Sequence, residues 1–284
     1  MSRIVVWAGG RLRDPAEPVL SAVDHGVTVG DGVFETCGVV DGVAFALTRH
    51  LDRLARSARG LGLADPDLGL IRDAVAAVLA DPDGLGRVRV TVTAGLGPLG
   101  SGRTPGAQSV LVVAGPAGGP APVRVVRVPW TRNERSAVAG LKTTSYAENV
   151  VALAAAARAD AHEALLANTR GQLCEGTGSN VFVERRGELI TPALASGCLA
   201  GITRALVLEW SAAAGLPVRE AGPDELPFAV LDEVGAAGAR LALSGSVRTF
   251  VPVVALDGVE VPVSDLTRSV ADLYATRAAL DVDP

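Results

Sequence analysis

The stretch Gly115-Pro-Ala-Gly-Gly-Pro-Ala-Pro122 decides how the chain is divided. It contains only glycine, proline and alanine, a composition typical of a linker without secondary structure. The chain has 284 residues, which is long enough for two domains that each bury a core. We therefore expect a small N-terminal domain over residues 1–116, a linker over 117–122 and a larger C-terminal domain over 123–284.

The residues before the linker alternate between β-rich runs and helical patterns. Asp41-Gly42 separates two of these runs and is a strong signal for a β-hairpin. Thr48 is suited to cap a helix that carries leucine and alanine on one face and arginine on the other. The sequence predicts strands at Ile4–Trp7, Val33–Val40, Val43–Leu47, Val88–Thr93 and Val110–Ala114, and helices over 49–62 and 68–80.

The residues after the linker follow the same mixed pattern. Apolar residues from Val150 to Ala157 recur at the spacing of one helical face, which predicts a helix over 146–160. Asp257-Gly258 predicts a second hairpin, and because two such turns imply antiparallel pairing, we expect an α+β fold rather than a doubly wound parallel sheet. Further helices are expected from Gly201 and from Ser264 or Asp265, with strands at Val123–Val128, Ala164–Ala167, Val181–Glu184, Glu188–Ile190, Leu241–Leu243 and Val251–Leu256.

Composition and charge exclude several classes of function. The net charge of −5 and the pI near 5.3 argue against nucleic acid or an anionic membrane as a partner. No run of about 18 uncharged apolar residues is present, so we expect no transmembrane helix. Three scattered cysteines do not form a disulfide framework, and three histidines without metal-ligand spacing predict no metal site. Because the N-terminus lacks the apolar core of a signal peptide, we expect a cytoplasmic protein.

The basic residues contain one unusual feature. Of the 26 lysine and arginine residues, only Lys142 is a lysine. A solvated surface accepts either cation, but chemistry that needs an amine able to lose its proton or to form a Schiff base cannot use arginine. Lys142 lies between a predicted strand and a predicted helix, where functional sites are often built. An exposed loop lysine is the alternative interpretation.

Further segments carry groups that complement such an amine. Glu175 precedes small residues that let a flat ligand approach the backbone, and its carboxylate suits a protonated ring nitrogen. Gly201 and Thr203 at a helix start offer N–H groups and a hydroxyl for a phosphate, to which Ser246 and Arg53 can add. Amine, carboxylate and phosphate cradle together describe a site for pyridoxal 5′-phosphate (PLP), although each alone also fits a solvated turn or helix face.

Four motifs, taken in this order, resemble those of the class IV aminotransferases, which are the fold-type IV PLP enzymes. They are Gly30-Asp-Gly-Val-Phe-Glu-Thr36, Lys142-Thr-Thr-Ser-Tyr-Ala-Glu-Asn149, Glu175-Gly-Thr-Gly-Ser-Asn-Val-Phe182 and Gly201-Ile-Thr-Arg204. The resemblance implies a two-domain α+β fold like that of D-amino-acid aminotransferase. It also implies PLP between the domains, the PLP lysine in the C-terminal domain, and a homodimer.

The same resemblance assigns roles to individual residues. Lys142 matches the catalytic Schiff-base lysine, Glu175 the partner of the ring nitrogen, and Arg53 the arginine that binds the phosphate. The other cofactor-binding residues that it implies are Ser179, Asn180, Gly201, Ile202, Thr203 and Ser246.

The residues expected to face the substrate depart from the family's patterns. D-amino-acid aminotransferases typically hold the substrate carboxylate with an arginine and a histidine, where this chain has Leu99 and Ser101. The lyases of the family often carry an arginine where this chain has Ala94 and a second arginine in the same segment. They also often carry an arginine where this chain has Gly38. As substrate residues we expect Phe34, Arg103, Tyr146 and Arg248, with the two arginines as carboxylate ligands.

The first two motifs look more like those of the lyases. They favour a PLP-dependent lyase that cleaves 4-amino-4-deoxychorismate to 4-aminobenzoate and pyruvate. The alternative is an aminotransferase of D- or branched-chain amino acids with 2-oxoglutarate. A non-catalytic PLP-binding protein is a third hypothesis, which the presence of lysine, carboxylate and phosphate cradle disfavours.

Overall fold

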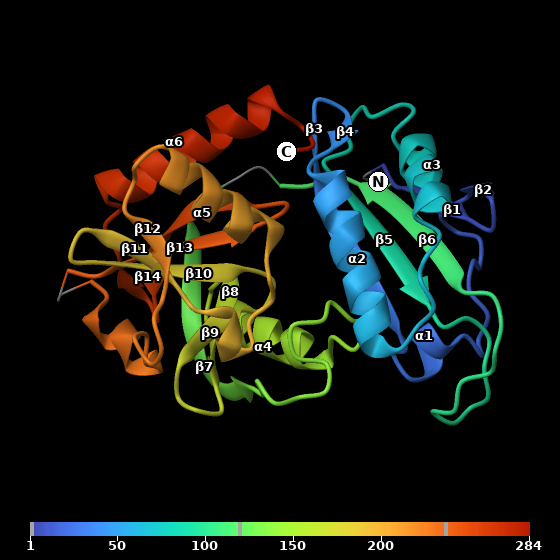
Figure 1. Cartoon of the computed structure of the whole chain (residues 1–284), viewed down its shortest axis with the longest axis horizontal. Coiled ribbons are helices and arrows are strands. Elements are labelled where there is room, and N and C mark those ends of the chain that lie inside the picture. Colours follow the sequence, from blue (N-terminus) through green and yellow to red (C-terminus); the bar gives the residue numbers. More distant parts are fainter. Residues whose placement is uncertain (1–2, 119–120, 236–237) are drawn as a thin grey trace. The chain divides into compact units, whose positions relative to one another are not determined.

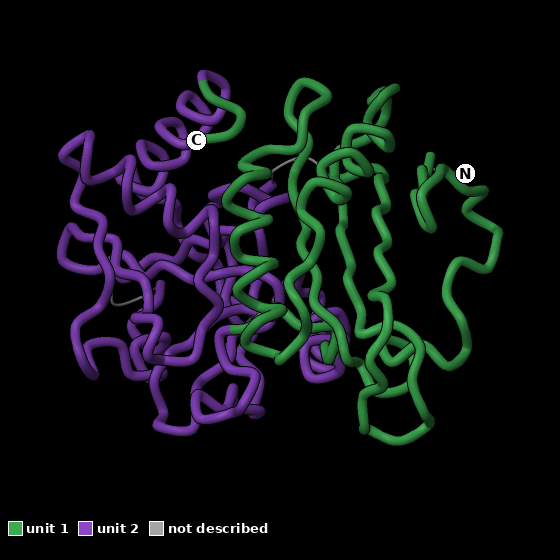
Figure 2. Tube along the Cα trace, turned by 45° about the vertical axis from the view of Figure 1, so that its right-hand side comes forward, with its two compact units in different colours: residues 1–118, 141–146, 281–284 green, residues 119–140, 147–280 purple. Residues whose placement is uncertain are grey.

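The computed structural model describes residues 3–118, 121–235 and 238–284 and divides into two compact units (Figures 1 and 2). The first unit comprises Met1–Gly118, Leu141–Tyr146 and Asp281–Pro284, and the second comprises Gly119–Gly140 and Ala147–Leu280. The boundary thus falls inside the predicted linker, although residues 119 and 120 of that linker lie outside the described residues.

The first unit is built on a six-stranded sheet in which all pairs are antiparallel. The strand order is β2 (Arg11–Arg13), β1 (Val5–Ala8), β6 (Ser109–Gly115), β5 (Arg87–Thr93), β3 (Gly32–Val40) and β4 (Val43–Ala44). Asp41 and Gly42 join β3 to β4 with φ angles of 48° and 82°, which is the left-handed backbone that a tight hairpin needs. The predicted hairpin is therefore confirmed.

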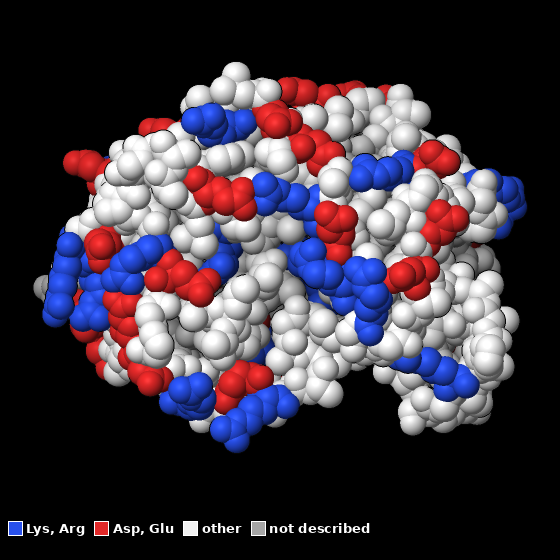
Figure 3. Space-filling view, viewed as in Figure 1, with Lys and Arg blue, Asp and Glu red and all other residues white. Residues whose placement is uncertain are grey.

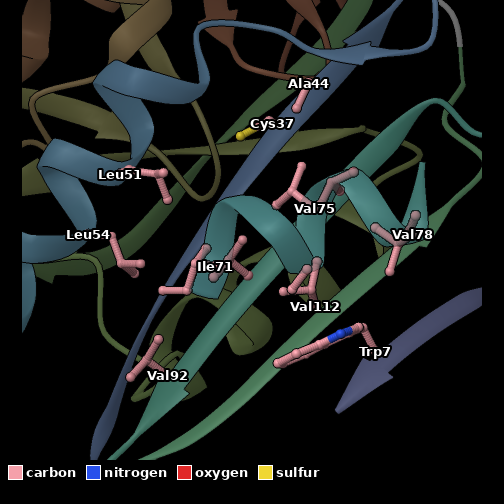
Figure 4. Packing of buried hydrophobic residues seen from close by; sticks show 14 of the residues in the cluster. Trp7, Cys37, Ala44, Leu51, Leu54, Ile71, Val75, Val78, Val92 and Val112 are labelled. Carbon is pink, nitrogen blue, oxygen red and sulfur yellow. The ribbon is translucent and has the colours of Figure 1, made fainter. Parts of the chain in front are cut away.

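Two helices cover one face of this sheet and form the core of the first unit (Figure 4). Helix α2 (Leu47–Leu61) buries Leu51 and Leu54, and α3 (Leu68–Val78) buries Ile71 and Val75. A short helix, α1 (His25–Thr28), precedes β3 and is capped by Asp24. The sequence correctly predicts the apolar face of α2, but Arg53 on the opposite face is also buried.

The expected cap of α2 is wrong. The N-cap residue is Ala46, in the left-handed region, and no side chain caps the helix. The Thr48 hydroxyl instead donates to Asp283 Oδ2 at 2.6 Å, and its N–H donates to Asp283 Oδ1 at 2.8 Å. Arg49 Nε adds a bond to the Pro284 carbonyl at 2.7 Å. A carboxylate 235 positions later in the chain thus supplies what a local cap would supply, and this ties the C-terminus to the first unit.

The segment Leu141–Tyr146 differs from the expected domain assignment, because it belongs to the first unit. Phe34 N–H donates to the Lys142 carbonyl at 3.0 Å and Thr144 N–H donates to the Gly32 carbonyl at 2.8 Å, so the segment extends the sheet along the edge of β3. Leu141 packs on Gly60 of α2, where a Cβ atom would come within 2.6 Å of Leu141 Cδ2. Lys142 is therefore held by the first unit and not by the C-terminal domain.

The second unit contains a nine-stranded mixed sheet. Its order is β12 (Val218–Glu220), β11 (Glu188–Thr191), β10 (Asn180–Arg185), β13 (Arg240–Gly245), β14 (Thr249–Leu256), β7 (Val123–Arg132), β8 (Glu163–Asn168) and β9 (Leu173–Gly176), with β15 (Val259–Glu260) paired to β14. β7 is parallel to both β14 and β8, and β11 is parallel to β12. The two units together confirm the α+β class.

Three helices pack in the second unit. α5 (Ile202–Ala213) and α6 (Asp265–Leu280) contact each other through Trp210 and Tyr274, whose ring centroids lie 5.2 Å apart. α4 (Ala147–Arg158) turns a different face inward from the one the sequence pattern suggests, because the small residues Ala152 and Ala156 pack beside β7 and β8. Val150 on the predicted apolar face is 63% exposed.

The described surface carries charges of both signs (Figure 3), and the three cysteines lie inside the protein. Acidic and basic side chains are interspersed on the face drawn in Figure 3, without a large area of one sign. Cys37, Cys174 and Cys198 are all buried and carry free thiols. Within the described ranges, no helix is long and apolar enough to cross a membrane, and no group of three or more His, Cys, Asp or Glu side chains is arranged to hold a metal ion.

The core of the first unit makes a direct prediction. Leu54→Ala should lower the free energy of unfolding by about 2–5 kcal/mol, because Leu54 is fully buried between α2 and the sheet and its truncation leaves a cavity. Leu70→Ala on α3 is the matched control, since Leu70 is 39% exposed. Urea unfolding of both variants checks this, and equal losses would contradict the described core.

Candidate active site

Lys142 presents its amine to two aromatic rings of the first unit. Its Nζ atom lies 4.2 Å from the ring centroid of Phe34 and 5.6 Å from that of Tyr146. The two rings meet edge to face at 5.2 Å. The Lys142 N–H donates to Ser57 Oγ of α2, at 3.2 Å, and the backbone pairing to β3 fixes the residue on both sides. The expected substrate residues Phe34 and Tyr146 are thus brought to the amine.

A buried charged cluster lies beside this lysine. Glu35 accepts two bonds of 2.7 Å from Arg53 Nε and Nη2, and a third bond of 2.7 Å joins it to His50 Nδ1. Burial raises the pKa of Glu35, but the charge and hydrogen bonds of Arg53, with those of His50, lower it to about 2. Burial lowers the pKa of His50, and the charges of Arg53 and Lys142 add to this against the hydrogen bond to Glu35. Arg53 is therefore a fixed cation in the neighbourhood of Lys142.

Neither Glu35 nor His50 is among the residues that sequence reasoning selected. Period-two alternation along β3 points Glu35 toward α2 and Phe34 to the opposite face. A buried charge needs a partner, so a glutamate on the core face of a strand was the available signal. That signal indicates that Glu35 is a buried, paired carboxylate, but it does not show which residues of α2 pair with it.

Arg89 is a second residue that the sequence analysis did not single out. It lies on β5 opposite Thr36 of β3, and its guanidinium carbon is 3.7 Å from the Phe34 ring centroid. The alternation of arginine or threonine with valine along β5 places it on the polar face of the sheet. Phe34 is thus flanked by the cationic groups of Arg89 and Lys142.

The structure gives Arg103 a different setting from the one expected for a substrate residue. Its Nε and Nη2 atoms donate to both carboxylate oxygens of Asp31, at 2.7 and 2.6 Å. Its Nη1 and Nη2 atoms also donate to the carbonyls of Gly62 and Leu61, each at 2.8 Å. The pairing holds the pKa of Asp31 below its usual value. All three guanidinium nitrogens of Arg103 therefore donate hydrogen bonds within the first unit, to Asp31 and to the end of α2.

Glu175 is held at the end of β9 in the second unit. Its Oε1 atom accepts from Arg132 Nε at 3.1 Å and its Oε2 atom accepts from the Leu199 N–H at 2.9 Å. Arg132 also donates to the side-chain oxygen of Asn149 at 3.1 Å, and Asn149 donates to the Thr177 carbonyl. The carboxylate is thus buried, oriented and supplied with a counter-charge. Sequence reasoning found Glu175 but not Arg132.

The start of α5 lies next to Asn180. Asn180 Nδ2 donates to the Leu199 carbonyl at 2.9 Å, and a Cβ atom on the N-cap residue Gly201 would overlap Asn180 Oδ1. Ile202 and Thr203 begin the helix, where N–H groups have no intrahelical acceptor. Thr203 also hydrogen bonds to Tyr274, whose pKa burial raises to about 12. The expected cofactor residues Asn180, Gly201, Ile202 and Thr203 therefore lie together at the start of α5.

Ser179 and Arg248 meet at a buried carboxylate. Glu163 accepts bonds from Thr177, from Ser179 Oγ at 3.0 Å and from Arg248 Nη1 at 3.3 Å. Burial raises the pKa of Glu163 despite these partners. Ser246 lies two residues before Arg248 in the turn between β13 and β14. Arg248 is thus engaged with a residue of its own chain.

The arrangement can be compared with known proteins. A sequence profile described as amino-transferase class IV matches residues 32–256. The chain belongs to the class IV aminotransferases. This family is PLP-dependent, so the chain is a PLP-dependent enzyme.

Relatives of this class IV aminotransferase have different activities. A bifunctional aminodeoxychorismate lyase / D-amino acid transaminase of Mycobacterium tuberculosis is 30% identical over 245 residues, covering 75% of this chain and 79% of the relative. A fold IV transaminase of Curtobacterium pusillum is 32% identical with a TM-score of 0.82, covering 98% and 99% of the two chains. A branched-chain aminotransferase of Thermoproteus uzoniensis is 26% identical with a TM-score of 0.84, covering 95% and 93%.

The side chains present fit PLP. The backbone around Lys142 is held by hydrogen bonds to β3, a buried arginine is fixed near this lysine, and a buried carboxylate is oriented by an arginine and a peptide N–H. At Gly201 the absence of a side chain makes room for Asn180 Oδ1, and no side chain caps the first N–H groups of α5, which suits them to a phosphate. In addition, Ser244 Oγ, whose residue pairs in register with Asn180, is buried without a hydrogen-bond partner in the described part of the chain.

The Glu35 cluster predicts a pH-dependent stability. Because the folded pKa of Glu35 is about 2 and its ordinary value is 4.5, its contribution is complete above pH 4.5 and is lost as the pH falls toward 2. Glu35→Gln should cost about 3–5 kcal/mol of unfolding free energy at pH 7, since Arg53 is left buried without its counter-charge. The difference from the wild type should narrow below pH 4.5.

Urea unfolding of both proteins at pH 7, 4 and 3 measures this difference. Glu17→Gln is the matched control, because Glu17 is paired with Arg13 at the surface and should change stability by about 1 kcal/mol or less. A Glu35→Gln effect that stays constant over the whole pH range would contradict the assigned ionisation.

The fit at Gly201 predicts a change in cofactor affinity. Gly201→Ala should raise the PLP dissociation constant about 5- to 100-fold, because the added methyl displaces Asn180 or the first turn of α5. Absorbance titration of the apoenzyme with PLP measures the constant. Gly106→Ala serves as the control, since the nearest atom to its added Cβ is 4.0 Å away. Equal PLP affinity in the wild type and Gly201→Ala would refute this role of the helix start.

Proposed function

We propose that this chain is an aminotransferase that moves the amino group of a D- or branched-chain α-amino acid to 2-oxoglutarate. The contacts of Arg103 favour an aminotransferase over a lyase. Lyases of the family often carry two arginines in the segment that begins at Ala94, and the nearest arginine after it in this chain is bound to Asp31 and to two carbonyls. Because Arg103 is bonded to Asp31, it does not supply the second substrate-binding arginine of a lyase.

The proposed roles of the residues follow from their contacts. When bound, PLP supplies an electron-withdrawing ring that stabilises negative charge on the carbon next to the amino group. Lys142 Nζ would take the proton from that substrate carbon and deliver it to the cofactor carbon that keeps the amino group, and the backbone bonds to β3 limit the positions that Nζ can reach. Arg53, Thr203 and Ser246 are proposed to bind the phosphate.

The remaining cofactor residues have supporting roles. Glu175 is proposed to face the ring nitrogen, and Arg132 and the Leu199 N–H keep its carboxylate in a single orientation. Ser179 and Asn180 keep the loop between β9 and β10 in place through Glu163 and the Leu199 carbonyl. Ile202 and Gly201 contribute the start of α5.

The lyase activity on 4-amino-4-deoxychorismate is a second candidate. The observation that favours it is the similarity to the bifunctional relative, in which one chain is named for both activities. The same Lys142 serves either reaction, because elimination replaces return of the proton when the substrate carries a leaving group.

A half-reaction separates the two candidates. Holoenzyme mixed with D-alanine or L-leucine, without a 2-oxo acid, should convert its cofactor absorbance stoichiometrically to that of the amine form, and 2-oxoglutarate should reverse it. No conversion with any amino acid, together with catalytic pyruvate release from 4-amino-4-deoxychorismate, would establish the lyase instead.

Substitution of the lysine tests the mechanism itself. Lys142→Ala and Lys142→Arg should both lose at least about 10³-fold in turnover, because neither side chain can take up a proton at neutral pH. Borohydride reduction of the wild-type holoenzyme should fix the cofactor on Lys142, which mass spectrometry of peptides locates. Full turnover in Lys142→Arg would refute the assignment.

A further inference from the structure

The backbone around Lys142 has two supports within the first unit. One is the start of β3, because Phe34 N–H donates to the Lys142 carbonyl at 3.0 Å. The other is α2, because Lys142 N–H donates to Ser57 Oγ at 3.2 Å. Leu141 adds a packing contact with Gly60 of the same helix. The place of the Lys142 amine therefore depends on how the start of β3 and α2 are held relative to each other.

Asp31 belongs to the first of these supports. It stands between Gly30 and Gly32, and the carbonyls of both glycines accept hydrogen bonds from a residue that closely follows Lys142. Thr144 Oγ1 donates to the Gly30 carbonyl and Thr144 N–H donates to the Gly32 carbonyl, each at 2.8 Å. Any movement of Asp31 is therefore passed to the lysine segment through the two neighbouring carbonyls.

Arg103 links Asp31 to the second support. Its Nε and Nη2 atoms donate to both carboxylate oxygens of Asp31, at 2.7 and 2.6 Å. Its Nη1 atom donates to the Gly62 carbonyl and its Nη2 atom to the Leu61 carbonyl, both at 2.8 Å. These carbonyls lie at the end of α2, where backbone carbonyls have no intrahelical donor. One guanidinium thus connects the start of β3 to the end of α2.

The ion pair is suited to hold these elements together. The Asp31 side chain is 10% exposed, and the hydrogen bonds and charge of Arg103 keep its pKa below the usual value although burial raises it. His25 Nδ1 lies 3.4 Å from Asp31 Oδ2 as well. A bidentate pair with a mostly buried carboxylate contributes more than an exposed pair does. Arg59 and Asp65, near the same end of α2, form such an exposed pair, at 3.5 Å.

We infer that Asp31 and Arg103 are positioning residues for Lys142, because their ion pair holds the start of β3 against the end of α2 on either side of the lysine backbone. This role replaces the substrate contact that the sequence predicts for Arg103. The inference rests on the proposed role of Lys142 as the proton-transferring amine. It applies equally to an aminotransferase and to a lyase, since both reactions use the same amine.

Hydrogen exchange of the holoenzyme tests the link without turnover. Arg103→Gln should speed amide exchange about 5- to 50-fold at Phe34 and Thr144, because local opening no longer has to break the ion pair. Mass spectrometry of peptides measures this, and peptides from β13 in the second unit should exchange as in the wild type. Asp65→Asn is the matched control and should change exchange at Phe34 and Thr144 less than about twofold. Wild-type exchange at both amides in Arg103→Gln would overturn the inference.

Single-turnover kinetics distinguish positioning from substrate binding. With D-alanine or L-leucine, Arg103→Gln should lower the maximal rate of cofactor conversion about 10- to 100-fold, because a small displacement of a reacting group is costly. The amino acid concentration that gives half-maximal rate should change less than about twofold. A raised half-maximal concentration with an unchanged maximal rate would mean that Arg103 binds the substrate, and would overturn the inference.

A double variant tests whether the two residues act as one unit. Asp31→Asn should reproduce the loss seen in Arg103→Gln, and the double variant should lose no more than about twofold beyond either single variant. Arg103 is 36% exposed, so Arg103→Gln should keep the fold and carries the test if Asp31→Asn does not fold. Arg103→Lys should fall between Arg103→Gln and the wild type, because it keeps the charge but not all of the donors. Losses that multiply in the double variant would contradict a shared role.

These experiments separate the inference from the proposed function. If no amino acid converts the cofactor, transamination is wrong, and hydrogen exchange still decides whether the ion pair holds the lysine segment. If amino acids convert the cofactor in Arg103→Gln at the wild-type rate, the proposed function stands and the positioning role is refuted.

Discussion

The position of the Lys142 amine depends on two backbone hydrogen bonds to the edge of β3. Phe34 N–H donates to the Lys142 carbonyl, and Thr144 N–H donates to the Gly32 carbonyl, so residues on either side of Lys142 are tied to the edge of β3. A lysine has four rotatable bonds, and fixing its backbone removes the largest uncertainty in the place of its amine. The same strand carries Phe34 and Glu35, which face opposite sides of the sheet. Strand β3 therefore supplies both the aromatic ring that Lys142 contacts and Glu35, the carboxylate that holds Arg53 in place.

Charge compensation is the second constraint on the site. Glu35 and Arg53 are both buried, and each would be costly without the other, so their pairing fixes α2 against β3. Glu175 and Arg132 form a similar pair in the second unit. Arg89 stands apart from these pairs, since no acidic side chain of the described chain accompanies it.

Sequence patterns predicted much of the local structure. The strands β3 and β5, the Asp41-Gly42 turn and the leucine face of α2 each appear where the sequence analysis places them. Patterns failed where partners come from distant parts of the chain. Thr48 bonds to Asp283 instead of capping its helix. The apolar residues of α4 lie outward, since alanines allow the helix to approach its strands more closely.

The sequence by itself determined the family and the identity of the amine. Only one lysine is present, and its motif, with those of Glu175 and Gly201, is specific enough to assign the chain to the class IV aminotransferases. The tertiary structure decided which carboxylate each arginine pairs with, because pairing depends on distances that spacing along the chain does not encode. Arg103 and Arg248 look available in the sequence and are bound by Asp31 and Glu163. Arg89 looks like an ordinary strand residue, and strand pairing places it beside the ring that Lys142 contacts.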